Sequence, residues 1–419
     1  MSATLNPITL SEEERLQHPL VQFFLDGLRE VTTGSQKYHI WMASLTLLMC
    51  LGAYAYGVQL RAGLTVTGMH DHVSWGFYIS NFTFLVGMAA AAVILVMPTY
   101  VLQDHDFKKA VLVGEALAVA ALIMALSFVV ADMGGPDRLW HVIPMIGVFN
   151  WPASMLTWDI LVLNGYLVLN LLIPFYLLYS RYMGREPNKR IYVPAVLLSI
   201  LWAVSVHLVT AFLYAGLPAR PFWNSALLGP RFLATAFTAG PAMMILVLRQ
   251  LRQHTDIDVA QATIDKLATV TTVGAQICLI MLASELFVEF YRDTHHGLGA
   301  RYLFFGLVGH TRLVPWIWTS IAMSVTATAI LSVHPLRHTD RWLKFACTLL
   351  FVGILIEKGL GTIIPGFIPE PWGRIDEYAP TWVELCVTLG IWAMGTFVFT
   401  ILTKAAIPVE LGVVKYRRR

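Results

Sequence analysis

Five ionisable residues in strongly apolar surroundings are the ones in this sequence that could carry chemistry. Asp132 ends one apolar run, and Asp159 lies about one turn inside the next. His72 directly precedes an apolar run, while His207 and Arg231 lie inside two others. A carboxylate at the centre of a bilayer costs roughly 2.5 to 3.5 kcal/mol, so two of them near one membrane face call for an explanation.

Residues of these types suit the binding of a quinone. The head group exchanges two electrons and two protons, so it needs a hydrogen-bonding group at each carbonyl and a titratable partner. Histidine fits because its pKa lies near neutrality, and a nearby carboxylate can orient the imidazole and pass protons on. We therefore predict a quinone site with His72, Asp132 and Asp159 as catalytic groups, and with His207 and Arg231 as further binding residues.

Each of these residues also has a purely structural interpretation. An ion pair between Arg231 and Asp159 could simply join two helices. A single buried histidine such as His207 often forms a hydrogen bond between helices. Glu357 and Lys358 are adjacent and are interpreted as a snorkelling pair at the membrane interface. A haem held by two histidines is disfavoured, because only His207 lies well inside an apolar segment.

The composition is that of a membrane protein. Hydrophobic residues make up 57% of the chain and charged residues only 13%, against roughly 25% charged residues in soluble domains. Apolar runs of about 20 residues recur, and each is long enough to cross the hydrocarbon core. The net charge of +3 is spread over the loops. It therefore bears on topology and does not indicate nucleic-acid binding.

The cysteines give no sign of a metal centre. Cys50, Cys278, Cys347 and Cys386 stand singly in apolar segments, without the close spacing of a cluster or a haem attachment motif. We expect no haem, no iron–sulfur cluster and no metal site in this chain.

The apolar runs predict an all-α polytopic membrane protein with ten transmembrane helices, arranged as two four-helix bundles plus two extra helices. The predicted spans are about 40–60, 75–101, 110–131, 155–180, 191–216, 226–249, 266–290, 314–333, 342–359 and 382–404. Lys and Arg concentrate in every second connection and near both termini, which predicts that both termini are cytoplasmic. The loops 61–74, 132–154, 291–313 and 360–381 then face outward.

The predicted organisation follows from these spans. A surface helix is expected in the N-terminal segment, capped by Ser11 with three glutamates in its first turn. The segments are a cytoplasmic N-terminal part (1–39), the first span and its outer loop (40–74), a first bundle with the quinone site (75–217), a second bundle (218–360), and the last span with a basic tail (361–419).

A proton path across the membrane is a further hypothesis. Glu115 is the one acid placed clearly on the cytoplasmic side, while Asp159 and Glu285 lie toward the outer face. Proton uptake from the cytoplasm for chemistry on the outer side would make turnover electrogenic. We name Glu115, Asp159 and Glu285 as candidates for this path.

Several motifs resemble the NrfD/PsrC family over nearly the whole chain. They are the run Asp71–Phe84 (DHVSWGFYISNFTF), the turn Asp132–His141, the stretch Phe149–Asp159 with its Trp-Asp pair, His207–Pro241 with Pro-Arg-Phe, and Tyr302–Trp318. The length of ten spans is similar to the branch that contains QrcD, DsrP and HmcC. The turn reads Asp-Met-Gly-Gly-Pro, with Gly135 where the family often has Arg.

The resemblance implies a membrane subunit in the bacterial or archaeal cytoplasmic membrane that exchanges electrons with menaquinone and holds no redox cofactor of its own. It implies a quinone pocket at the periplasmic end of the first bundle, lined by His72 and Asp132, with Asp159 in proton handling. It also implies a periplasmic ferredoxin-like iron–sulfur partner, and further subunits such as a multihaem cytochrome c and a molybdopterin-oxidoreductase-like protein.

Two other functions are compatible with ten spans. A secondary transporter would place its charges at the bilayer midplane on broken helices, whereas here they gather toward one face. A passive membrane anchor would have no quinone site at all. Normal electron transfer after substitution of His72 and of Asp132 would favour the anchor.

Overall fold

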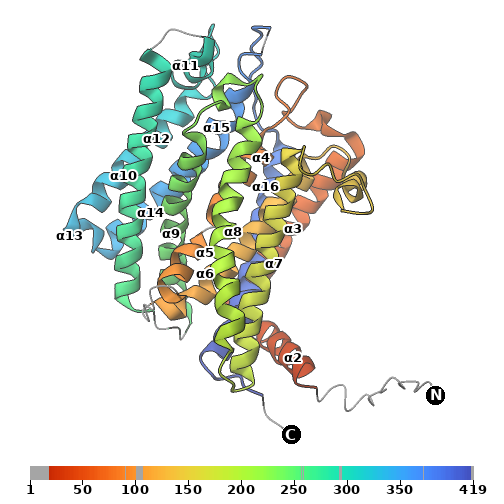
Figure 1. Cartoon of the computed structure of the whole chain (residues 1–419), viewed down its shortest axis with the longest axis vertical. Coiled ribbons are helices and arrows are strands. Elements are labelled where there is room, and N and C mark those ends of the chain that lie inside the picture. Colours follow the sequence, from red (N-terminus) through yellow and green to blue (C-terminus); the bar gives the residue numbers. More distant parts are fainter. Residues whose placement is uncertain are drawn as a thin grey trace.

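The computed structural model describes residues 18–89, 91–100, 107–255, 257, 259–291, 295–370 and 372–416 (Figure 1). In this part of the chain ten helical runs are long and apolar enough to cross a membrane, which confirms the predicted all-helical fold. The runs are α3 (Gln36–Ala62), α4 with α5 (Phe77–Ala89 and Ala91–Tyr100), α6 (Lys108–Asp132), α7 (Met155–Tyr182), α8 (Lys189–Ala215), α9 (Leu228–His254), α10 (Gln261–Tyr291), α12 (Val314–Ser332), the run starting with α14 (Asp340–Ile354), and α16 (Trp382–Glu410).

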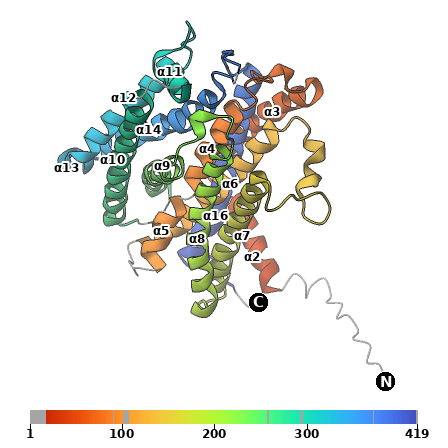
Figure 2. The same ribbon diagram turned by 45° about the horizontal axis from the view of Figure 1, so that its top comes forward.

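The spans form two packed bundles. In the first bundle α4 and α5 pack against α6 and α8, and α7 packs against both α6 and α8. In the second bundle α9 packs on α10 and α14, and α12 packs on α10 and α14 (Figure 2). The two extra helices, α3 and α16, pack against each other, and α16 also packs on α6.

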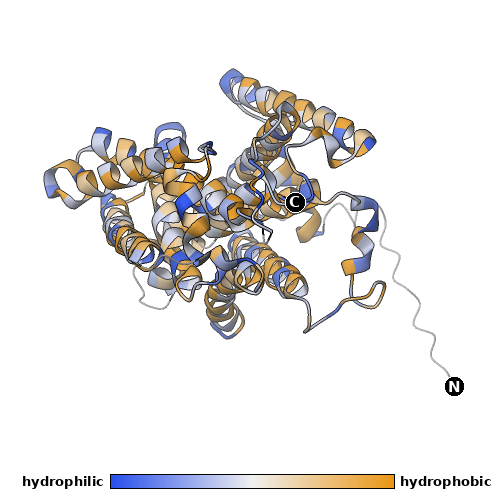
Figure 3. Cartoon of the chain, turned by 90° about the horizontal axis from the view of Figure 1, so that it is seen from above, coloured by the Kyte–Doolittle hydropathy of each residue, from blue (hydrophilic) through white to orange (hydrophobic). Residues whose placement is uncertain are grey.

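Helix α4 is the centre of the molecule. Every described residue from Tyr78 to Ala89 is buried, because α6, α8 and α9 surround it. A helix that is apolar on all sides can be buried in this way. By contrast, α7 exposes Leu161, Val168 and Leu172, as expected for side chains that face lipid. Apolar residues dominate the helices seen from above (Figure 3).

The ninth span continues beyond its predicted end at residue 359. After α14 the chain forms a π-helical segment, η6 (Leu355–Leu360), then α15 (Gly361–Ile363) and a 3-10 turn, η7 (Ile364–Phe367). The start of the predicted outer loop 360–381 is therefore helical. Segment η6 packs against α4, so it links the ninth span to the first bundle. Single π turns of this kind are frequent at functional sites.

Helix α2 (Pro19–Thr32) precedes the first span and packs against α7 and α16. Phe23 contacts the rings of Phe175 and Tyr179, while Phe24 and Leu28 are exposed. A helix of this kind suits a membrane surface, as predicted for the N-terminal segment. The predicted cap at Ser11 lies outside the described residues. Because α16 ends beside α2, we call this side of the molecule the α2 end.

Candidate functional site

His72 lies in the loop between α3 and α4, at the end of the molecule opposite α2, where a second loop covers it. Its Nδ1 contacts the carboxylate of Glu370, and its Nε2 lies 3.9 Å from Oδ2 of Asp376. Both acids belong to the connection between η7 and α16. Asp376 is in turn paired with Arg374 at 2.7 Å. The imidazole is half-buried and has two acidic neighbours, so it can exchange protons with them.

Glu384 connects the loop between α3 and α4 to the connection between η7 and α16. Its carboxylate is fully buried and accepts hydrogen bonds from the Tyr378 hydroxyl at 2.5 Å, from the Gly68 amide at 2.7 Å and from the Thr381 amide at 2.8 Å. The Tyr378 oxygen also accepts a hydrogen bond from the amide of Phe77, the first residue of α4. Burial, together with the Glu384 carboxylate, raises the pKa of Tyr378. The hydroxyl therefore stays protonated and keeps donating.

Asp132, the last residue of α6, has a carboxylate oxygen without a partner. Its Oδ1 is buried and has no hydrogen bond among the described residues. Electrostatic interactions connect Asp132 with Glu384 and with Tyr78. The Tyr78 hydroxyl donates to Gln59 at 2.7 Å, and the Gln59 amide donates to the carbonyl of Ala131 at 2.7 Å. Helix α3 thus contributes to the wall beside Asp132.

Asp159 is buried in α7 and accepts a 2.7 Å hydrogen bond from the hydroxyl of Thr210 in α8. Thr210 and Tyr214 lie one turn apart on the buried side of α8. The Tyr214 hydroxyl lies 2.5 Å from that of Thr83 in α4, and Tyr214 interacts electrostatically with both Asp132 and Asp159. The structure therefore brings the two predicted aspartates to one tyrosine at the same end of the first bundle.

An aromatic cluster lies beside this tyrosine. The ring of Tyr214 is 5.7 Å from that of Trp75 and 5.5 Å from that of Trp223, and both tryptophans contact Phe367. Trp223 precedes α9, and Phe367 ends η7. The cluster therefore joins the first bundle to the connections of the second one and excludes water from this region.

His207 is buried in α8, one turn before Thr210. Its Nδ1 lies 2.9 Å from the carbonyl oxygen of Ala203, so this nitrogen must carry the proton. The Nε2 atom is buried and has no hydrogen-bond partner in the described part of the chain. The Nε2 atom of His207 is therefore available as a hydrogen-bond acceptor in the protein interior.

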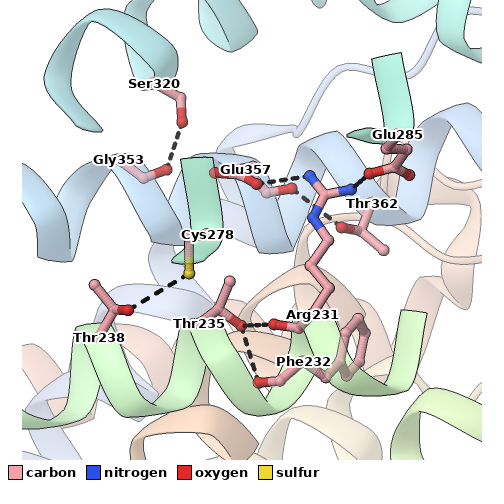
Figure 4. A network of polar contacts seen from close by, with 10 residues as sticks. All are labelled: Arg231, Phe232, Thr235, Thr238, Cys278, Glu285, Ser320, Gly353, Glu357 and Thr362. Carbon is pink, nitrogen blue, oxygen red and sulfur yellow. Dashed lines mark hydrogen bonds and ion pairs between the residues drawn. The ribbon is translucent and has the colours of Figure 1, made fainter. Parts of the chain in front are cut away.

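Arg231 points away from the predicted aspartates. Its guanidinium pairs with Glu285 of α10 and, at 2.6 Å, with Glu357 of η6 (Figure 4). The interpretation that it balances Asp159 is wrong for this structure, because the acids that contact it belong to the second bundle. These three side chains line a small cavity of about 20 Å³ together with Glu289.

The interpretation of Glu357 and Lys358 as a snorkelling pair is also wrong. Their residues are only 6% and 3% exposed, respectively. The amino group of Lys358 lies 3.3 Å from the carbonyl oxygen of Phe232 and 4.5 Å from the centroid of its ring. The helix continues past the predicted end of the span, so both side chains lie within packed protein and not at the lipid surface.

Glu115 lies near the α2 end of the first bundle. It is 4% exposed and lines a cavity of about 850 Å³. The lining also contains Arg181, which pairs with Glu410, and Lys189. A buried acid that lines a cavity with charged residues in its wall can take up protons from that side. Of the three candidates for a proton path, Glu115 thus lies at one end, whereas Asp159 and Glu285 lie toward the other.

Several polar residues next to the predicted site had not been assigned to it from the sequence: Gln59, Tyr78, Glu370, Asp376 and Tyr378. His72 and Glu370 are 298 positions apart in the chain, and no spacing rule connects them. Among the described residues, no group of three or more His, Cys, Asp or Glu side chains could hold a metal ion.

Comparison with known proteins identifies the family. The family model described as "Polysulphide reductase, NrfD" matches residues 65–367, from the loop before α4 to the end of η7. The chain belongs to this family. It is an integral multi-pass membrane protein, and α3, α16 and the loop that carries Glu370 and Asp376 lie outside the matched range.

Curated relatives of this NrfD-family chain cover most of its length. It is 24% identical over 395 residues to a putative membrane subunit of dimethyl sulfoxide reductase from Halobacterium salinarum, covering 85% of this chain and 88% of that protein. It is 24% identical over 392 residues to the Hdr-like menaquinol oxidoreductase integral membrane subunit of Archaeoglobus fulgidus, covering 90% of this chain and 95% of that protein. It is 22% identical over 393 residues to the menaquinone reductase integral membrane subunit of Nitratidesulfovibrio vulgaris, covering 87% of this chain and 90% of that protein.

Proposed function

We propose that this chain is the quinone-binding membrane subunit of a respiratory oxidoreductase complex, and that menaquinone binds beside Asp132 at the end opposite α2. The buried, unpartnered Oδ1 of Asp132 carries this proposal. Burying a polar atom without a partner costs about 1–3 kcal/mol, so a site of this kind favours a bound hydrogen-bonding ligand. The names of two relatives, a menaquinol oxidoreductase subunit and a menaquinone reductase subunit, support the choice of ligand.

The residues around Asp132 fit a quinone head group. When bound, menaquinone supplies two-electron chemistry that is coupled to two protons. Asp132 would hold one oxygen of the ring by a hydrogen bond, and it would hold or release a proton at Oδ1. Asp159 stays oriented by Thr210, and the Tyr214 hydroxyl lies close enough to interact with both aspartates.

His72 exchanges protons between the site and the aqueous surface. It is half-buried, and its two nitrogens face Glu370 and Asp376. An imidazole between two carboxylates can pass a proton outward, because each neighbour can accept it in turn. Arg231 and Glu285 have no part in this site, since they pair with each other in the second bundle.

Electrons pass between this site and a partner subunit. This chain provides no cysteine cluster for a redox centre of its own. The loop 133–154 exposes Trp140, Ile146 and Val148 at the same end as Asp132. We assign this surface to a periplasmic iron–sulfur subunit, through which further subunits of the complex connect. The end opposite α2 then faces the periplasm.

Proton uptake from the cytoplasm accompanies turnover in this proposal. Glu115, which lines the cavity of about 850 Å³, is the entry point. In liposomes that contain the complex with its α2 end inside, the lumen should become more alkaline while menaquinone is reduced, because reduction of the ring consumes two protons. A lumen pH that does not change during turnover would contradict the path.

The proposal is tested by the substitution Asp132→Asn in the intact complex. A group that transfers protons contributes about 10²–10⁴ in rate, so oxidation of a short-tailed menaquinol should slow at least about tenfold. Asp265→Asn is the matched control, because Asp265 is a partly exposed acid near the start of α10, away from the Asp132 site, and should retain the normal rate. Copurified menaquinone should also decrease in the Asp132→Asn complex. Normal rate and normal menaquinone content in that variant would favour a passive anchor.

A further inference from the structure

Two adjacent residues of η6 lie where the bundles meet. Glu357 pairs with Arg231 of α9, inside the second bundle. Lys358 lies between α9 and α4: its amino nitrogen contacts Phe232 of α9 and lies 2.9 Å from the position that a Cβ atom on Gly87 of α4 would take. The π-helical turn therefore places the base at the boundary between the bundles, next to an acid that lies inside the second bundle.

Lys358 is buried without a counter-ion in direct contact. Among the described residues no carboxylate forms an ion pair with it, and its polar contact is the carbonyl oxygen of Phe232. The ionisable groups that face it are Cys278 of α10, Glu357 beside it and His207 of α8. Ionisable residues inside a membrane are costly and mark proton relays or ion pathways. A buried lysine without a carboxylate partner suits proton transfer better than structural pairing.

The charges of the neighbouring cluster show why a proton on Lys358 is tolerated. Arg231 contributes one positive charge, whereas Glu285 and Glu357 pair with it and Glu289 lines the same cavity. The acids outnumber the single arginine, so a protonated Lys358 offsets part of the excess negative charge. Loss of its proton to another site therefore separates charge between the bundles.

His207 is positioned to receive this proton. Gly87 lies next to both side chains: its backbone forms a hydrogen-bonding contact with His207, and a Cβ atom on it would lie 2.9 Å from the amino nitrogen of Lys358. The Nε2 of His207 is buried and forms no hydrogen bond of ordinary geometry with the described residues. From His207, the buried side of α8 leads through Thr210 to Asp159.

We propose that Lys358 and His207 form a proton-transfer pair that connects the second bundle to the quinone site. An N–H bond of the Lys358 ammonium breaks and an Nε2–H bond forms on His207, leaving a neutral amine and an imidazolium. The reverse transfer restores the starting state, so no electron or other reactant is consumed. This inference rests on the proposed quinone function, because a change of charge at the Asp132 and Asp159 site is what drives the transfer.

Redox-difference infrared spectroscopy on the purified complex, with histidine rings labelled by carbon-13, tests the pair. A change in the redox state of bound menaquinone should produce an imidazolium signal in the unmodified complex. The signal should be lost in His207→Gln, which assigns it, and in Lys358→Met. Lys404→Met is the matched control, since this lysine of α16 also lies over an aromatic ring, that of Tyr38 at 5.1 Å, but far along the chain from the pair. It should keep the signal.

A milder substitution distinguishes loss of proton transfer from loss of folding. Gly87→Ala would place a methyl group against the amino nitrogen of Lys358, and it should weaken the imidazolium signal at unchanged menaquinone content. No menaquinone signal in the unmodified complex would overturn the proposed function. A menaquinone signal without an imidazolium signal, or with one that persists in Lys358→Met, would overturn only the proton-transfer pair.

Discussion

Asp132 and Glu384 interact electrostatically, yet the protein holds them in different ways. Glu384 accepts hydrogen bonds from Tyr378 and from the amides of Gly68 and Thr381, whereas Oδ1 of Asp132 has none among the described residues. A buried carboxylate that accepts several hydrogen bonds has a structural role. A buried oxygen without a partner is available to a ligand. Glu384 therefore supports the loops around Asp132, and we propose Asp132 as the reactive acid.

Substitution of Tyr378 tests this support. Tyr378→Phe removes a donor to Glu384 and the acceptor for the Phe77 amide, so we expect a loss of about 1–3 kcal/mol in the free energy of unfolding. Because the pKa of Tyr378 is raised in the folded protein, its contribution is complete below the ordinary tyrosine pKa of about 10 and declines as pH rises above it. Thermal unfolding of the purified complex between pH 7 and 11 measures this.

The expected pattern is a difference in melting temperature that is constant from pH 7 to 9 and narrows at higher pH. Tyr291→Phe is the matched control, since Tyr291 is 73% exposed at the end of α10. It should unfold like the unmodified protein throughout. A Tyr378→Phe protein with the same melting temperature as the control would show that the hydroxyl does not hold the loops together.

Helices α3 and α16 are the elements that close the site on one flank. They approach so closely that a Cβ atom on Gly390 would lie 2.6 Å from the Cα of Gly52. Small residues permit such contacts between membrane helices. This contact positions Gln59 of α3 and Glu384 of α16 close to Asp132. Both helices lie outside the family match, so this flank is an addition to the matched core.

The helix contact predicts the effect of adding one methyl group. Gly390→Ala should destabilise the protein by about 1–3 kcal/mol, because the backbone of α3 must move away. Gly57→Ala in α3 is the matched control: no atom lies within 4 Å of its added Cβ, and alanine is the better helix former by roughly 0.5–1 kcal/mol. Thermal unfolding should rank Gly57→Ala at or above the unmodified protein. Equal melting temperatures for the two variants would contradict the close contact.

At the scale of the whole molecule, polar residues are distributed differently at the two ends. The α2 end carries the cavity with Glu115, Arg181 and Lys189, and the opposite end carries the loops around His72 and Asp132. The proposed function requires that these ends face different compartments. It also requires that the basic end be cytoplasmic, in agreement with the distribution of Lys and Arg in the connections.

Accessibility of single cysteines measures this orientation. Trp372→Cys, in the connection between η7 and α16, should react with a membrane-impermeant maleimide in intact spheroplasts. Glu186→Cys, in the connection between α7 and α8, should react only after lysis. Both positions are exposed, and the four natural cysteines lie within membrane spans, where a charged reagent reacts poorly. The opposite labelling pattern would reverse the topology and place the Asp132 site in the cytoplasm.

The sequence by itself determined the class of fold and the membrane spans. Runs of about 20 apolar residues cross the membrane whatever their neighbours are, so ten helices could be predicted from local composition. It also identified Asp132, Asp159 and His207 as unusual, because an ionisable residue in an apolar run is visible without any structure. The motifs in Asp71–Phe84 and Phe149–Asp159 were sufficient to suggest the family.

Only the tertiary structure decided which side chain meets which. His72 faces Glu370 across 298 positions of sequence, and Arg231 pairs with Glu285 and Glu357 instead of Asp159. The partner of a buried charge depends on how helices rotate and pack, and Lys358 is buried because η6 packs against α4, where an interface residue was expected. Local sequence contains the tendency to form a helix, whereas the register between helices is a property of the packed molecule.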